Sequence, residues 1–379
     1  MKMFSRLSSE RGAILIHVGL ASVVLIAFSM FVIDHGVMWV SRGQAQNAAD
    51  SGALAGAIAL AFDSFSDRAD DGPAKQAALQ FARANKVFGE DPDVNVGTDV
   101  IFYNPGNAAK FPAECADDSC VRVDVYRTNR DGRANPLPTM FGRLVGLTEQ
   151  GVRAMAIARA APANASDSLK PWAVADKWLE GDGTPLATTD AFEPMAMPPD
   201  QYTPPDEDDP GTGFTLSTDY GTELALTIGV EGDVIRPGWV QPIDLGGDFV
   251  ENITGSPPST WQIGDEPGKL TGSWSNQSRA AAAALMSLDS GADWDPVSRR
   301  VIGSNFEFSP RIVALPVFDL DYFVGTGRVR IVNILGFFVD RLVGSAIIGY
   351  LVSKPDLLVA DGESVADEAS FLKNVSLIR

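Results

Sequence analysis

The chain contains few of the side chains that catalysis requires. Its only histidines are His17 and His35, one inside an apolar segment and one at its end. Histidine-based triads and histidine-ligated metal sites are therefore excluded from the rest of the chain. The sequence also lacks the G-x-x-x-x-G-K-S/T, H-E-x-x-H and G-x-S-x-G patterns of well-known enzyme classes. We predict a protein that is not an enzyme and has no catalytic residues and no small-molecule substrate.

Carboxylates are the remaining candidates for chemistry. Asp319 and Asp321 alternate along a predicted strand, so both would lie on one face and could act in acid–base catalysis. A solvated strand edge explains the same spacing, and this is the interpretation that we favour.

Two acidic clusters are candidates for binding Ca²⁺, the one cofactor that the sequence leaves open. Asp91, Asp93 and Asn95 place oxygen atoms at alternating positions, but Val96 and Phe102 stand where an EF-hand requires Gly and Glu. The second cluster consists of Asp206, Glu207, Asp208 and Asp209. Its position in a Pro-rich stretch favours a solvated linker over a metal site.

The two cysteines predict a disulfide. Four residues separate Cys115 from Cys120, too few for the paired arms of a zinc site and two more than a C-x-x-C redox motif has. Short-loop disulfides are typical of exported chains. This one would precede a strand at Val121 to Tyr126.

The N-terminal segment predicts a membrane anchor. Ala13 to Ile33 is a run of about 20 residues without a formally charged side chain, long enough to cross a hydrocarbon core of about 30 Å. Basic residues precede it and Asp34 follows it, so the positive-inside rule places the N-terminus in the cytoplasm. We assign residues 1–12 to a cytoplasmic flank and residues 13–36 to a single transmembrane helix in the inner membrane. The body would then be periplasmic or extracellular.

Two other fates of this segment compete with a retained anchor. A cleaved signal peptide would have a shorter apolar core that ends in a small-residue cleavage site. Prepilin-like processing after Gly12 usually requires Glu at the fifth position of the mature chain, where this sequence has His17. We therefore favour the retained anchor.

The helical pattern continues beyond the span with two stripes. Polar side chains recur at Asp34, Arg42, Gln46 and Asp50. Small residues form the second stripe, which consists of Ala45, Ala49, Gly52, Ala53, Gly56, Ala57 and Ala61. Small side chains let another backbone approach closely. That backbone belongs either to a partner helix or to the protein's own domain, and we expect the latter for part of the stripe.

The span and the two stripes together resemble a known family. Asp34-His35-Gly36 and the run from Arg42 to Ala57, RGQAQNAADSGALAGA, closely resemble the N-terminal region of TadE/TadG-like Flp pilus-assembly proteins of the tight-adherence system. Many TadG proteins also carry a von Willebrand A domain with an Asp-x-Ser-x-Ser metal motif. That motif is absent here, because Phe65 interrupts its nearest match at Asp63 to Ser66.

The remaining chain predicts a membrane-anchored α+β protein, with the long helix docked on a small α+β domain that precedes a β-rich antiparallel domain. Residues 37–161 would hold the helix and the small domain, residues 162–213 a connector with a Pro-rich acidic linker, and residues 214–379 the β-rich exported domain. The expected elements of the small domain are helices at 73–89 and 137–145 and strands at 94–103, 121–127 and 151–160. In the β-rich domain we expect a helix at 279–288 and two buried strands in 331–352.

Charge and resemblance set the functional prediction. A net charge of −19 argues against nucleic acid as a partner. The resemblance implies a non-enzymatic structural protein that helps to assemble or anchor an Flp-type pilus used in cell adhesion. Its partners would be the membrane, other pilus-assembly or pilin-like proteins and further copies of itself. The alternative is an envelope binding module whose C-terminal β domain recognises a surface ligand or a partner subunit.

Overall fold

The computed structural model describes residues 10–62, 68–115, 119–230, 232–306, 308–355 and 362–378. Most of the predicted cytoplasmic flank, and the segment around Phe65, lie outside these residues. The chain forms two compact units. The first contains α1 up to Gly56, residues Arg68–Ala158 and the chain from Leu377. The second contains the end of α1 and residues Arg159–Ser376.

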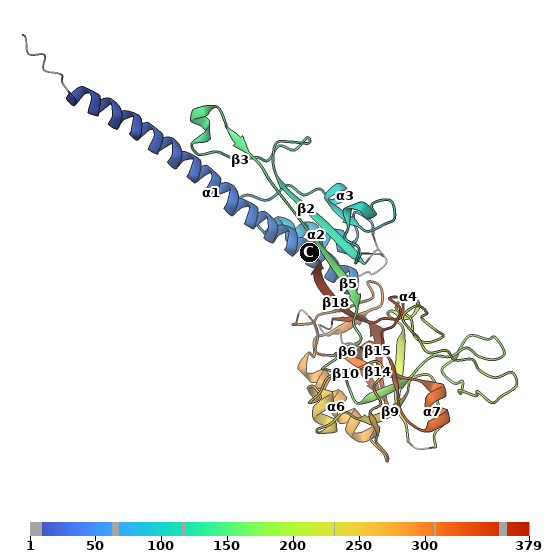
Figure 1. Cartoon of the computed structure of the whole chain (residues 1–379). Helices are drawn as coiled ribbons and strands as arrows, with labels where there is room; N and C mark the ends of the chain where they lie inside the picture. The colour runs from blue at the N-terminus through green and yellow to red at the C-terminus, as the bar shows by residue number, and fades with distance from the viewer. Residues whose placement is uncertain are drawn as a thin grey trace, which may run out of the picture. The chain divides into compact units, whose positions relative to one another are not determined.

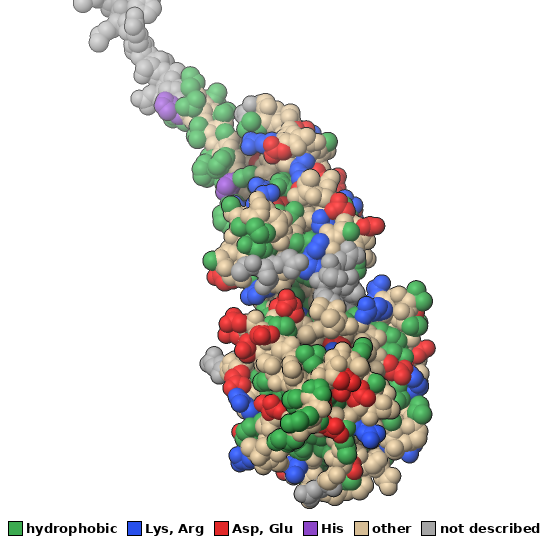
Figure 2. Space-filling model, turned by 90° about the vertical axis from the view of Figure 1, so that its right-hand side faces the viewer, with side chains coloured by type: hydrophobic (Ala, Val, Ile, Leu, Met, Phe, Trp, Pro, Cys, Tyr) green, Lys and Arg blue, Asp and Glu red, His purple; other side chains and the backbone are tan. Residues whose placement is uncertain are grey.

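The long N-terminal helix is confirmed. Helix α1 runs without interruption over Glu10–Phe62. From Ile14 onward it is long and apolar enough to cross a membrane, judged by length and composition alone. The hydroxyls of Ser22 and Ser29 donate to the carbonyls of Val18 and Leu25 at 2.8 and 2.9 Å, so they add no polar face. Hydrophobic side chains gather on this exposed part of α1 (Figure 2).

The first unit contains a small α+β domain beside α1 (Figure 1). Strands β1, β2 and β5 are neighbours in that order, and β1 pairs antiparallel with β2. Its elements after α1 are α2 (Pro73–Ala84), α3 (Val96–Asp99), β1 (Val100–Phe102), η1 (Ala108–Lys110), β2 (Cys120–Arg127), β3 (Leu137–Pro138), η2 (Gly142–Val145), β4 (Glu149–Gln150) and most of β5 (Val152–Pro162).

Two predicted elements of this domain are wrong in detail. Residues 94–103 are not one strand, because the side chain of Asn95 accepts the Gly97 amide at 2.9 Å and starts α3. Residues 137–145 are not an α-helix. Pro138 disfavours the helical conformation of the residue before it, so Leu137 pairs with Gln150 in a short strand and only η2 is helical.

The second unit contains the β-rich region. Its elements are β6 (Ala165–Ser166), β7 (Trp172–Ala175), α4 (Leu216–Asp219), β8 (Glu223–Ile228), β9 (Trp239–Asp244), α5 (Phe249–Thr254), β10 (Trp261–Gln262), β11 (Gly268–Lys269), α6 (Ser275–Leu288), β12 (Asp293–Asp295), β13 (Arg300–Ile302), β14 (Ile312–Phe318), α7 (Leu320–Thr326), β15 (Ile331–Val343), β16 (Ala346–Val352), β17 (Lys354–Pro355) and most of β18 (Leu372–Ile378).

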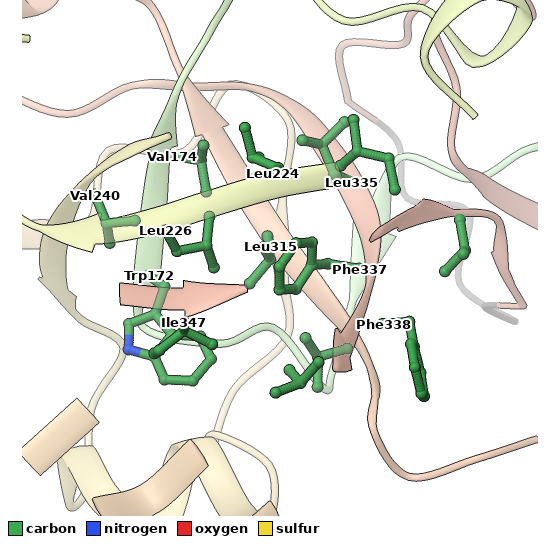
Figure 3. Close-up of a cluster of buried hydrophobic side chains, with 14 of the residues drawn as sticks. Trp172, Val174, Leu224, Leu226, Val240, Leu315, Leu335, Phe337, Phe338 and Ile347 are labelled. Carbon is green, nitrogen blue, oxygen red and sulfur yellow. The ribbon is translucent and has the colours of Figure 1, made fainter. Parts of the chain in front are cut away.

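A β-barrel forms the centre of this unit. The sheet order is β11-β9-β7-β14-β15-β16-β8, and an additional pairing of β9 with β8 closes it. Most pairs are antiparallel, as expected, but β7 with β14 and β8 with β9 are parallel. Alternate residues of the strands fill the core, where the side chains of Leu226, Leu315 and Phe337 lie close together (Figure 3).

The two buried strands expected in 331–352 are confirmed as β15 and β16. Asp340 and Arg341, the two charged residues in this apolar stretch, lie near the end of β15 beside a register shift. There Arg341 forms an ion pair with Glu223 at 2.7 Å. The expected helix at 279–288 is confirmed as part of α6.

The connector predicted at 162–213 needs correction. Its first part supplies β7, which lies between β9 and β14 in the barrel sheet. Trp172 to Ala175 form a buried apolar strand. The sequence did not predict it, because the rest of the segment is polar and rich in proline. The Pro-rich part also folds back, because Leu179 bridges to Gln201 and the Tyr202 hydroxyl donates to Asp176.

The strand predicted for Asp319 and Asp321 is also wrong. Both residues lie at the start of α7, where the Asp319 carboxylate accepts the Tyr322 amide at 2.9 Å. Asp319 is thus a helix cap, a structural role that accounts for its position.

Candidate functional site

The polar stripe of α1 holds the small domain through side-chain contacts with its backbone. The Asp34 carboxylate accepts hydrogen bonds from the amides of Met140, Phe141 and Gly142, with N–O distances of 2.7, 3.1 and 2.6 Å. Three amides directed at one carboxylate form a charge-assisted anchor at this end of the domain.

The segment that presents these amides is a tight loop. We call residues Leu137–Gln150 the β3–β4 loop; its ends pair as Leu137 with Gln150 and Pro138 with Glu149. Gly146 adopts a positive φ of 84° and closes the turn with bonds to the carbonyls of Arg143 and Gly142. Figure 1 shows β3 and the green turn beyond it running alongside α1.

Further along the same helix, glutamines make the contacts. The Gln46 amide donates to the Met155 carbonyl of β5 at 2.9 Å and to the Asp50 carboxylate at 2.8 Å. Gln44 accepts the backbone amide of Phe88 at 2.8 Å. Asp34, Gln46 and Asp50 are thus brought into one docking surface. The contact of Gln44 was not predicted from the sequence, because this residue lies outside the four-residue spacing of the polar stripe.

Arg42 lies apart from these hydrogen bonds. Its side chain is exposed and lines a surface cavity of about 630 Å³ together with His35, Trp39 and Arg153. Trp39 is exposed and donates from its indole Nε1 to His35 Nε2 at 2.8 Å. Tryptophan at this position, just beyond the predicted span, is typical of membrane–water interfaces.

The small-residue stripe faces the protein's own small domain in its central part. Ala45, Ala49 and Ala53 are fully buried, as are Ala74, Ala78 and Ala82 of α2. A Cβ atom built on Gly52 would lie 2.9 Å from both the Ala78 carbonyl oxygen and the Ala82 Cβ. One on Gly56 would lie 3.0 Å from the Ala78 Cβ. Ala57 and Ala61, the last members of the stripe, are also buried. The glycines therefore let the two helices approach closely.

Cys120 is the first residue of β2, and Cys115 precedes that strand. Cys115 and Cys120 form a disulfide with their Cα atoms 5.9 Å apart, and both are buried beside Ile157. On the same strand, burial alone would raise the pKa of Asp124. Hydrogen bonds from Arg122 and Arg153 more than offset that effect and hold the pKa below its ordinary value.

The acidic clusters make internal contacts. Asp93 forms an ion pair with Arg133 at 3.2 Å, and Asp206 accepts the amides of Asp208 and Asp209. Within the described part of the chain, no group of three or more His, Cys, Asp or Glu side chains is placed to hold a metal ion. Calcium binding stays a prediction.

The geometry defines a class of protein: a long apolar helix, suited to a membrane, whose C-terminal half is docked on a small α+β domain, with a β-barrel later in the chain. Residues 12–59, nearly all of α1, match the model of the family described as putative Flp pilus-assembly TadE/G-like. The resemblance noted from the sequence is thereby confirmed for this region. No curated protein and no solved structure matches the chain. The matched segment includes Asp34 and Gln46 of the docking surface and both glycines of the small-residue stripe, Gly52 and Gly56.

Proposed function

We propose that the protein is a non-enzymatic, single-pass membrane protein that assists the assembly or anchoring of an Flp-type pilus. One observation carries this proposal: the segment matched by the pilus-assembly family is both the apolar helix and the docking surface of the small domain. The family region is thus joined to the rest of the chain by a specific interface. Its role would be to hold the folded domains at the membrane.

The proposed topology places the N-terminus in the cytoplasm and the two units outside it. The basic residues before the span and the excess of acidic residues after it support this orientation. The partners would be other pilus-assembly or pilin-like proteins of the inner membrane. Further copies of this chain could also associate along α1.

Two matched variants test the anchor. Leu25 lies at the centre of the predicted span, where an arginine costs about 3 kcal/mol on insertion scales. Leu25→Arg should lose membrane association and, in a strain that lacks the gene, should fail to restore surface filaments. Leu288→Arg places the same charge on an exposed leucine of α6 and should behave as the wild type. Filaments of normal number without the gene would contradict the proposal.

The binding alternative has a specific feature in its favour. The second unit contains a cavity of about 260 Å³ lined by Tyr220, Trp294 and Phe308 among others. The Trp294 ring stacks on Tyr350 with centroids 4.8 Å apart, and aromatic walls are common in ligand pockets. Normal filaments combined with a loss of surface attachment in a Trp294→Ala strain would favour this function.

A further inference from the structure

The β3–β4 loop exposes an unusual set of apolar side chains. Met140, Leu144 and Leu147 are 60%, 70% and 64% exposed, although the loop also contains a closed turn with internal hydrogen bonds. An exposed leucine alone needs no explanation, but three large apolar side chains within eight residues of a small loop form a patch. The patch therefore calls for an apolar partner.

The position of the loop along α1 indicates what that partner is. Asp34, which receives the loop amides, lies two residues before the end of the predicted span at Gly36. A cavity of about 290 Å³ is lined by Ala27, Met30 and Phe31 from α1 and by Phe141 and Leu147 from the loop, among others. Ala27 is nine residues before Gly36, which corresponds to about 13 Å along the helix axis. The loop thus lies beside residues that would be within the bilayer.

The backbone of the loop goes a large part of the way to the requirement that a bilayer imposes. Inside hydrocarbon, each peptide group needs a partner within the protein. The amides of Met140, Phe141 and Gly142 donate to Asp34. Within the loop, the Leu144 amide donates to Phe141 and the Leu147 amide to Gly142, both at 2.9 Å, and the Gly146 amide donates to Arg143 at 3.2 Å. Six of the eight amides from Met140 to Leu147 thus have an acceptor within the protein, which lowers the cost of moving this backbone out of water.

We propose that the β3–β4 loop inserts into the exported-side leaflet of the membrane next to α1, with Met140, Leu144 and Leu147 in contact with lipid acyl chains. This inference rests on the proposed function of α1 as a membrane anchor. Arg143 is exposed between Met140 and Leu144, and its long side chain would extend toward the lipid phosphates when the loop is inserted. The loop would fix the depth and rotation of the small domain relative to the bilayer, which one helix cannot do alone.

Lipid-borne quenchers test the insertion in the full chain. Single cysteines are introduced at Leu144, at Val24 in the span and at Phe81, which is exposed on α2, and each is labelled with an environment-sensitive fluorophore under oxidising conditions. Each protein is reconstituted in bilayers that carry a nitroxide on the acyl chain. We expect the nitroxide to quench the probes at Leu144 and Val24, and aqueous iodide to quench only the probe at Phe81.

The three probes separate the failure of this inference from that of the anchor. Quenching at Val24 by the nitroxide together with quenching at Leu144 by iodide would overturn the inserted loop and leave the anchor intact. Quenching at Val24 by iodide would overturn the anchor, and the inserted loop with it. A measurement on the unmodified chain guards against disturbance by the label: a photoactivatable lipid should crosslink to the peptide with residues 140–147, and a crosslink confined to α1 would contradict insertion.

Discussion

The Asp34 carboxylate and the Gly142 amide are joined by a hydrogen bond of 2.6 Å across 108 residues of sequence. This bond connects the end of the predicted membrane span to the β3–β4 loop, which follows it much later in the sequence. Because Asp34 accepts two more amides of the same loop, one side chain fixes the position of the whole turn. The acid at the C-terminal end of the predicted span therefore has a structural partner inside the protein.

Removal of the Asp34 carboxylate should release the β3–β4 loop. In Asp34→Ala the amides of Met140, Phe141 and Gly142 lose their shared acceptor, so we expect their hydrogen exchange to accelerate on the order of tenfold. Exchange measured by mass spectrometry on the full chain in detergent reports this directly. Asp71→Ala removes an exposed carboxylate of the same unit and serves as the control. Unchanged protection in Asp34→Ala would show that the carboxylate does not hold the loop.

The disulfide should contribute to the stability of the first unit. Closing a loop this short lowers the entropy of the unfolded chain, which is worth about 2 kcal/mol, and both cysteines are buried. The double variant Cys115→Ser, Cys120→Ser should lose about that much free energy of unfolding. The reduced wild type should unfold at the same denaturant concentration as the double variant. Alkylation under non-reducing conditions should label neither cysteine, so recovery of two labelled thiols would rule the bond out.

Asp176 should give the second unit a dependence on acid pH. Its carboxyl group is buried, and desolvation raises its pKa from 3.8 to about 6, although the amides of Phe214 and Lys177 and the Tyr202 hydroxyl oppose the shift. The folded protein therefore takes up a proton between these two pH values. The resulting stabilisation is fully present below about pH 4 and is lost as the pH rises through about 6.

An asparagine at this position isolates the effect. Asp176→Asn keeps one carbonyl oxygen for the two backbone amides, which both bond to Oδ1 in the wild type. Relative to this variant, the wild type should gain on the order of 3 kcal/mol between pH 7 and pH 4. Denaturant titrations followed by tryptophan fluorescence measure the free energy of unfolding of both proteins at each pH. The contributions of the other carboxylates are the same in both proteins and cancel in the difference. A difference that stays constant with pH, or grows toward pH 7, would contradict the assignment.

Sequence periodicity predicted the elements whose apolar pattern is regular. Val121, Val123 and Val125 are all buried in β2, as their alternation indicates. Two of the failures occur where a local polar contact decides the conformation. The cap at Asn95 turns a predicted strand into α3, and the Asp319 cap turns another into α7.

The candidate site was predicted only in part. The small-residue stripe indicated a close helix contact, but its spacing does not say that α2, with its own row of alanines, is the opposing helix. The acceptor at Asp34 was visible, whereas its donors are backbone amides of a loop about one hundred residues away, which no side-chain pattern encodes. The Pro and Gly residues around Met140 were the available signal, because they mark a turn rather than a helix.

Two glycines of α1 should respond in opposite ways to the same substitution. At Gly52 an added methyl group would press on the Ala78 carbonyl oxygen and the Ala82 Cβ, both 2.9 Å away. The helices would have to separate, so Gly52→Ala should destabilise the first unit by about 1–3 kcal/mol. At Gly43 nothing lies within 4 Å of the new methyl group. Gly43→Ala should therefore stabilise the helix by up to about 1 kcal/mol, because alanine is the better helix former.

Native-state hydrogen exchange of the slowest amides in β2 measures both free energies in the full chain. Ala53→Leu provides a second probe of the interface and should act in the same direction as Gly52→Ala, since Ala53 is fully buried. If Gly52→Ala stabilised the unit as Gly43→Ala does, the close approach of α1 and α2 would be wrong. The small-residue stripe would then be left free for a partner helix, because its small side chains would face no helix of its own domain.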